Sequence, residues 1–185
     1  MKLKYKGLII LLFSFFFVSY SYSQTETARD SVIQFASNYL KVPYRRGGST
    51  PKAFDCSGFT SFVYRNFGYN LYRTASGQIK NACMIVDRSE LKRGDLVFFK
   101  GRNAKQNRIG HVGIIYEVDE DGSFRFIHAS VKYGVTITCG NKNYYATRFV
   151  AGGRILEERT LPLEPLPVNH IKKQMPKPVI PKYKL

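Results

Sequence analysis

The sequence is short of acidic residues, of cysteine and of long hydrophobic runs. Its 13 aspartates and glutamates stand against 29 lysines and arginines, so the 185-residue chain carries a formal net charge of +16. Three cysteines are too few for a disulfide scaffold, and their odd number leaves at least one thiol unpaired. A hydrophobic share of 44% and an aromatic share of 15% exclude intrinsic disorder for the bulk of the chain and suffice for one packed core.

The N-terminal segment is expected to be a cleaved secretory signal peptide. Residues 1–23 carry three lysines, then an apolar stretch over residues 8–18, and they end on small residues at Ser21 and Ser23. A basic start, an apolar stretch too short to span a bilayer comfortably and a small-residue cleavage site are typical of such peptides. No cysteine follows the apolar stretch, so the segment lacks the acceptor of a bacterial lipoprotein anchor. An uncleaved membrane anchor is the alternative interpretation.

The expected folded domain spans residues 24–158, between this segment and a C-terminal tail. Cleavage before Gln24 would remove three lysines and no acid from the +16 chain, leaving +13 (16 − 3), and the protein would be exported to the periplasm or cell envelope. Residues 159–185 hold six of the eight prolines and five lysines. Proline lacks the N–H donor that helices and sheets need, so we expect a flexible tail, lying in solvent or against an anionic surface.

Hydrophobic periodicity changes from helical to strand-like midway along the expected domain. Apolar residues at three- and four-residue spacing predict helices over residues 28–40 and 56–67 and a short helix over 74–82. Residues 42–54, which contain glycine and proline, are predicted as a loop. Alternating patterns then predict strands over residues 95–100, 111–118, 123–129, 134–138 and 148–155. This order predicts an α+β fold with N-terminal helices packed on a central antiparallel β-sheet.

Cys56 is the candidate nucleophile. It lies in the sequence Asp55-Cys56-Ser57-Gly58, where a glycine-rich loop leads into the second predicted helix. The unsatisfied N–H groups and the positive dipole end at a helix N-terminus stabilise a thiolate, which is the reactive form of cysteine. A small buried apolar side chain is the alternative role for this residue.

The two histidines of the expected domain, His111 and His128, fall on neighbouring antiparallel strands. With a turn centred on residues 120–121, residue 128 lies opposite residue 113, so His111 is its diagonal neighbour on the same face. The pair fits a relay in which Cys56 attacks a carbonyl, His111 takes and returns the proton, and His128 holds the His111 ring in its productive tautomer. A zinc site of the same three side chains is the competing chemistry, although their spacing matches no compact zinc motif.

Four segments of the chain carry a resemblance to a known family. They are, in chain order, residues 42–59 around Cys56, 93–99, 111–114 and 126–130. Together they resemble the nucleophile, strand-entry, base and third-residue motifs of the NlpC family of bacterial cell-wall cysteine peptidases, which have a circularly rearranged papain-like fold. The resemblance implies that Cys56, His111 and His128 are catalytic and that Tyr44 places its hydroxyl near the thiolate. It also implies a mechanism that uses neither a metal nor a cofactor.

The resemblance further implies binding residues and a substrate. The backbone N–H of Cys56 would contribute to an oxyanion hole, and substrate-binding or oxyanion roles would fall to Asp55, Ser57 and Arg73. The substrate would be the stem peptides of peptidoglycan, cut next to diaminopimelate. The bond would follow D-alanine at a cross-link or D-glutamate within a stem. Relatives that need a free stem N-terminus place an acid where this chain has Thr74, which favours a stem still attached to glycan.

The net charge agrees with a carboxylate-rich substrate. Peptide stems and an anionic cell wall would attract a protein of charge +13 (16 − 3), and salt would weaken the attraction. Nucleic acid is the usual partner for such a charge, but expected export and the absence of a nucleic-acid-binding motif argue against it. We expect a monomer. The alternative functions are an amidase or acyltransferase on the same Cys–His scaffold, or a non-catalytic wall-binding protein.

Cys83 and Cys139 could pair in an oxidising compartment, which would leave Cys56 as the single free thiol. The alternative is two unpaired thiols, one buried and one near the surface. Titration of thiols on unfolded, unreduced protein distinguishes the two: one free thiol per chain supports the pair, and three refute it.

Overall fold

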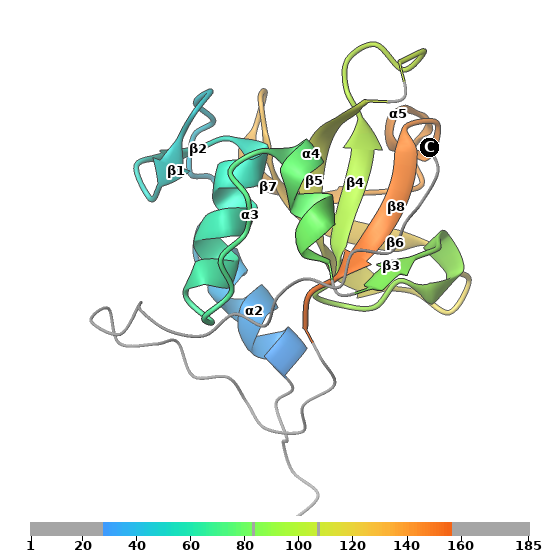
Figure 1. Ribbon diagram of the computed structural model, residues 1–185, viewed down its shortest axis with the longest axis horizontal. Coiled ribbons are helices and arrows are strands. Elements are labelled where there is room, and N and C mark those ends of the chain that lie inside the picture. The colour runs from blue at the N-terminus through green and yellow to red at the C-terminus, as the bar shows by residue number, and fades with distance from the viewer. Residues whose placement is uncertain (1–27, 83, 107, 157–185) are drawn as a thin grey trace, which may run out of the picture.

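The computed structural model describes residues 28–82, 84–106 and 108–156, which form a β-sheet with the two long N-terminal helices packed against one side of it (Figure 1). The expected signal peptide and C-terminal tail lie outside the described residues, as does Cys83. Within the described ranges no helix is both long enough and apolar enough to cross a membrane.

The sheet has six antiparallel strands in the order β3-β8-β4-β5-β6-β7. Five of them confirm the predicted strands, and the three-residue edge strand β3 was missed because it is too short to show a period. The bounds are β3 Met84–Val86, β4 Leu96–Lys100, β5 Ile109–Val118, β6 Phe124–Ser130, β7 Gly134–Cys139 and β8 Phe149–Arg154. The α+β prediction is therefore confirmed.

The helices precede most of the sheet, as predicted, with differences at their ends. They are α2 Ala28–Ser37, α3 Cys56–Arg65, α4 Ala75–Gln78 with the 3₁₀ turn η1 Ile79–Asn81, the 3₁₀ turn η2 Arg88–Glu90, and α5 Asn143–Ala146. The first helix ends earlier than predicted, because the N–H groups of residues 38–40 bond to carbonyls three residues back instead of four. Lys41 then adopts a left-handed φ of 70° and donates its N–H to the Val135 carbonyl at 2.8 Å. The predicted loop over residues 42–54 contains the short hairpin β1 Ser49–Thr50 and β2 Ala53–Phe54.

Alternation along the strands divides the core between the two faces of the sheet. On β4, Leu96 and Phe98 pack with the helices, whereas Val97 and Phe99 belong to a second apolar cluster on the opposite face. His128 lies two residues after Phe126 on β6, so its side chain is on the same face of the sheet as the second cluster, to which Phe126 belongs. The candidate histidines therefore face away from the main helix-packed core.

Asp95 joins three distant segments of the fold. Its fully buried carboxylate pairs with Arg29 of α2 at 3.1 Å and with Arg154 of β8 at 2.9 Å, and it accepts the Lys92 N–H at 2.9 Å. Arg29 also donates to the Arg93 carbonyl at 2.9 Å. A buried carboxylate is tolerated only when such partners compensate its lost hydration.

We predict that Asp95→Asn lowers the free energy of unfolding by about 3 kcal/mol, because it leaves two guanidinium groups without their shared counter-charge. Urea unfolding at pH 7, followed by circular dichroism, measures the loss. The matched control is Glu117→Gln, which breaks the partly exposed pair with Arg125 and should cost less than about 1 kcal/mol. Equal losses in the two variants would contradict the structural role of Asp95.

Candidate active site

Cys56 is the first residue of α3, and the capping residue Asp55 fixes the loop that delivers it. The Asp55 carboxylate accepts the Gly58 N–H at 2.7 Å, as a helix N-cap, and the Gly47 N–H at 2.9 Å. The loop passes so close to the helix that a Cβ built on Gly58 would lie 2.0 Å from the Gly48 carbonyl oxygen. The glycine-rich approach seen in the sequence is therefore required by the packing of loop on helix.

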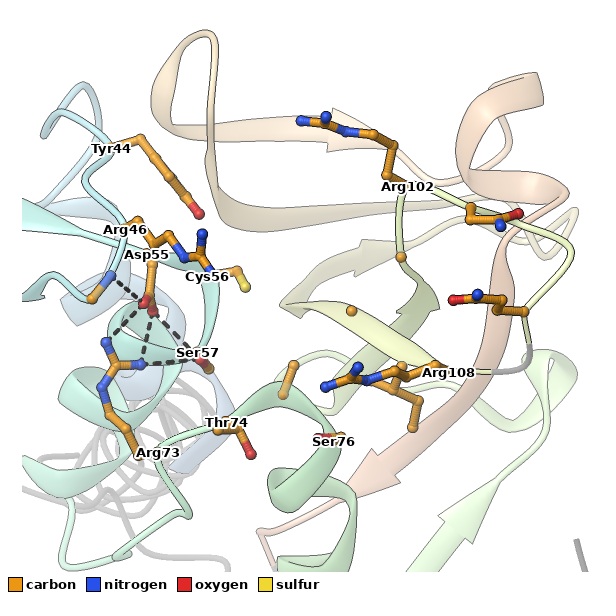
Figure 2. Close-up of a pocket in the computed structure, with 17 residues that line it drawn as sticks. Tyr44, Arg46, Asp55, Cys56, Ser57, Arg73, Thr74, Ser76, Arg102 and Arg108 are labelled. Carbon is orange, nitrogen blue, oxygen red and sulfur yellow. Dashed lines mark hydrogen bonds and ion pairs between the residues drawn. The ribbon is translucent and has the colours of Figure 1, made fainter.

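Arg73 lies beside this cap, brought there by the segment that leads into α4. Its guanidinium donates to both oxygens of the Asp55 carboxylate, at 2.9 and 2.7 Å, and to the Ser57 hydroxyl at 3.1 Å (Figure 2). Burial alone would raise the pKa of Asp55, but the hydrogen bonds from Arg73 and from the Gly58 and Gly47 amides outweigh it and lower the pKa. Asp55, Ser57 and Arg73, predicted to bind substrate, are thus held in one hydrogen-bonded cluster on the cleft wall.

Gln78, which the sequence gave no reason to select, ties this cluster to α3. Its fully buried side-chain amide donates to the Ser57 carbonyl at 2.9 Å and to the Tyr72 carbonyl at 3.0 Å, and it accepts from the Thr60 hydroxyl at 2.7 Å. The segment that carries Arg73 is therefore bonded to the first turn of the helix that carries Cys56.

The environment of Cys56 differs from the sequence prediction in one respect. Burial raises the pKa of the Cys56 thiol, and the negative charge of Asp55 raises it further. The backbone N–H groups of Val112, Ser57 and Cys56 act in the opposite direction, as expected at a helix N-terminus, but do not outweigh burial. The helix N-terminus thus favours the thiolate, as predicted, but burial and Asp55 outweigh it, so the neutral thiol is the favoured form in the resting site.

The two histidines meet as the predicted register requires. Ile114 pairs with Ile127, which puts His128 opposite Gly113 and makes His111 its diagonal neighbour. His111 Nε2 lies 2.9 Å from His128 Nδ1, and the rings are nearly perpendicular at 88°. His128 Nε2 in turn lies 3.0 Å from the Thr138 hydroxyl. These contacts leave Nδ1 of His111 as the ring nitrogen that can exchange a proton with another group.

Aromatic side chains enclose both imidazoles. The Phe126 ring stacks on His128 with ring centroids 4.6 Å apart. The centroid of the Tyr145 ring lies 5.7 Å from that of His128 and 6.2 Å from that of His111. Burial lowers the pKa of His111 to about 4. Burial, and secondarily the charge of His111, hold the pKa of His128 well below its ordinary value. Both rings are therefore neutral at pH 7.

Thr138 and Tyr145 were not selected from the sequence. Thr136 pairs with His128 across β6 and β7, and Thr138, two residues further along β7, has its side chain on the same face of the sheet. The predicted strand over residues 134–138 could therefore have indicated that Thr138 lies near His128. Tyr145 lies in the four-residue helix α5, which is too short to show a helical period. No pattern in the sequence could have placed its ring beside the histidines.

The predicted residues converge on two adjoining hollows. A cavity of about 450 Å³ is lined by Tyr44, Cys56, His111 and His128, and a cleft of about 810 Å³ shares Tyr44 and Cys56 with it. In Figure 2 the Tyr44 hydroxyl and the Cys56 sulfur point into the cleft. Burial raises the pKa of Tyr44, with further contributions from Cys56 and Asp55, which keeps its hydroxyl protonated as a hydrogen-bond donor.

Two other sequence hypotheses concern metal binding and disulfide formation. Across the described ranges, no group of three or more His, Cys, Asp or Glu residues is placed to hold a metal ion. Cys139 carries a free, half-buried thiol on β7. Its proposed partner Cys83 lies outside the described residues, so their pairing stays a prediction.

Comparison with known proteins places this site in a family. The model of the NlpC/P60 family matches residues 41–154, which include the candidate nucleophile and both histidines. The chain is 39% identical over 121 residues to the murein DD-endopeptidase MepS/murein LD-carboxypeptidase of Escherichia coli K12, covering 65% of this chain and 59% of that protein. It is 36% identical over 140 residues to the gamma-DL-glutamyl hydrolase of Bacillus subtilis, covering 75% of this chain and 32% of that protein.

Solved structures agree with the sequence relatives. An NlpC/P60 family protein from Bacillus cereus superposes with a TM-score of 0.63 at 30% identity, covering 70% of this chain and 41% of that one. The chain spans about 59% of the length of this E. coli relative, and 59% of the length of the probable endopeptidase NlpC homolog of Haemophilus influenzae. The family match covers more than half of the chain and contains the whole of the site described above. The chain therefore belongs to the NlpC/P60 family.

Proposed function

We propose that this protein is a cysteine endopeptidase that hydrolyses stem-peptide bonds of peptidoglycan next to diaminopimelate. One observation carries the proposal: Cys56 and the hydrogen-bonded pair His111 and His128 line one cavity, and that cavity adjoins an open cleft of about 810 Å³. The relatives named as murein endopeptidases and as a gamma-DL-glutamyl hydrolase support the choice of substrate.

The first step follows from the protonation states at rest. Thiol and imidazole are both neutral, so His111 Nδ1 accepts the Cys56 proton as the sulfur attacks the carbonyl carbon. His111 must then carry its own proton on Nε2, and it donates that N–H to His128 Nδ1 across 2.9 Å. His128 consequently carries its proton on Nε2 and donates it to the Thr138 hydroxyl. Each ring thus has one tautomer that satisfies all the contacts.

The remaining steps return every proton. The carbonyl oxygen becomes an oxyanion, for which the Cys56 N–H and the Tyr44 hydroxyl are the candidate donors. The His111 imidazolium protonates the leaving amine as the C–N bond breaks, which leaves a thioester on Cys56. Water then attacks the thioester while His111 takes its proton and returns it to the departing sulfur. The products are one carboxylic acid and one amine, with the enzyme unchanged.

Within this reaction we propose the D-alanyl–diaminopimelate bond of cross-links as the bond cut, supported by the murein DD-endopeptidase relatives. The D-glutamyl–diaminopimelate bond is the second candidate, supported by the gamma-DL-glutamyl hydrolase relative.

We further propose that residues 24–158 form the catalytic domain and act in the cell envelope after removal of residues 1–23. Digestion of purified sacculi, with mass spectrometry of the fragments, tests this set: conversion of cross-linked dimers into monomers with intact stems supports the first bond, and release of D-glutamyl ends supports the second. Release of whole stems from glycan would instead indicate an amidase.

We predict that Cys56→Ala lowers the rate of muropeptide hydrolysis by about 10⁴-fold or more, because it removes the nucleophile of a covalent mechanism. Circular dichroism should show an unchanged fold, and binding to sacculi should persist. Cys139→Ala is the control and should keep parental activity, since that thiol lies outside both hollows. Activity of Cys56→Ala within tenfold of the parent would overturn the mechanism.

The two histidines should differ in their response to substitution. His111→Asn removes the group that transfers protons and should leave almost no activity. His128→Asn, or His128→Gln, offers an amide oxygen that can still accept the His111 N–H, and should keep measurable activity. Steady-state kinetics on a soluble cross-linked muropeptide measures both. Equal losses at the two positions would contradict this division of roles.

Activity should persist well below neutral pH. The pKa of His111 is about 4, so the ring remains a competent base until the pH approaches that value. The free energy of unfolding should begin to fall at a higher pH. Unfolded histidines bind protons below about pH 6.5, the folded rings do not, and stability is therefore lost as the pH drops from there toward 4. Short kinetic assays alongside urea unfolding at each pH separate the two effects, and an acid limb of kcat/KM centred near pH 6.5 would refute the lowered pKa.

A further inference from the structure

The cleft beside Cys56 carries an excess of positive charge on its walls. Four arginines and a single aspartate line it: Arg46, Arg73, Arg102, Arg108 and Asp55. Asp55 and Arg73 neutralise each other through their two hydrogen bonds, at 2.9 and 2.7 Å. Three arginine charges therefore remain without a compensating carboxylate on the cleft wall.

These three arginines approach the cleft from different parts of the chain. Arg46 belongs to the loop that delivers the nucleophile, whereas Arg102 and Arg108 both lie in the connection between β4 and β5, on the other side of the cleft. Figure 2 shows the three side chains directed into the cleft. Arg102 also lines the cavity that contains His111 and His128, so it stands at the junction of the two hollows.

No ion pair or hydrogen bond engages the guanidinium groups of Arg46, Arg102 and Arg108 within the part of the chain that the structure describes. Arg29 and Arg154, by contrast, stabilise the fold and share the carboxylate of Asp95. Like charges gathered in a hollow repel one another, and a bound anion would relieve that repulsion. A guanidinium fork matches a carboxylate with two parallel hydrogen bonds.

We propose that Arg46, Arg102 and Arg108 form a carboxylate-binding subsite that selects stems whose carboxylates next to the scissile bond are free rather than amidated. The inference rests on the proposed function and adds the chemical class of substrate that the cleft accepts. A peptide extending along the cleft from Cys56 passes Arg102 at the junction and meets Arg46 and Arg108 on opposite walls. Amidation of a carboxylate removes the charge and replaces an acceptor by a donor, which faces a guanidinium unfavourably.

The test uses two cross-linked muropeptide dimers that differ only in whether their diaminopimelate and D-glutamate carboxylates are free or amidated. Each dimer contains both candidate bonds, so the outcome does not depend on which one is cut. We expect the parent protein to cleave the free-acid dimer with a kcat/KM about ten- to 100-fold higher than the amidated dimer. Cleavage of neither form would refute the proposed function itself, whereas equal cleavage of both would refute only the subsite.

Single Arg46→Gln, Arg102→Gln and Arg108→Gln variants locate the selectivity. At least one should lower kcat/KM for the free-acid dimer by about tenfold or more and leave the amidated dimer within about twofold of the parent. Arg65→Gln is the matched control, because it removes one exposed charge outside both hollows and should change neither rate. Equal losses on both dimers in the cleft variants, or a loss in Arg65→Gln as large as theirs, would overturn the assignment in favour of structural damage or general charge attraction.

Discussion

The hydrogen bond between His111 Nε2 and His128 Nδ1 is the contact on which the proposed chemistry depends. It can form between two neutral rings only if one nitrogen donates and the other accepts, and burial keeps both rings neutral. Phe126 and Tyr145 supply that burial from the sheet face opposite α2 and α3. The same apolar shell that completes the second core cluster therefore also keeps the imidazoles in the neutral form that the proposed mechanism requires.

A second constraint acts on the partner thiol, through the capping carboxylate of Asp55. As the N-cap of α3 it must remain ionised, and Arg73 supports that state. Its charge nevertheless raises the pKa of the adjacent Cys56 thiol, in the same direction as burial. The loop geometry that aims the sulfur thus works against an ionised resting thiolate. The proposed mechanism then requires a neutral base that shares the cavity with the thiol, and the unprotonated His111 ring is the candidate.

Much of this site could be predicted from the sequence, because its main determinants are local or depend on strand register. A two-residue period and one turn sufficed to pair His111 diagonally with His128, and a glycine-rich entry to a helix marked Cys56. The rest depends on tertiary packing that leaves no local pattern. Tyr145 reaches the histidines from a four-residue helix, and Gln78 anchors the Arg73 segment through buried contacts. The raised pKa of Cys56 likewise follows from burial, which is a property of the assembled fold.

The two hollows that meet at Cys56 share Arg102 at their junction but otherwise have different linings, which suit the two proposed tasks. The cavity around His111 and His128 is lined by the rings of Phe99 and Tyr145, which bury the imidazoles, as well as by Lys100, Arg102 and Lys132, and that burial keeps both imidazoles neutral. The cleft beyond Cys56 is open and rich in arginine, which suits recognition of an anionic chain. Had Arg46 and Arg108 also faced the imidazoles, their field would have lowered the affinity of the rings for protons further and weakened the proposed base. Because these two arginines line the cleft and not the cavity, the proposed subsite can attract carboxylates without further weakening the group proposed to accept the thiol proton.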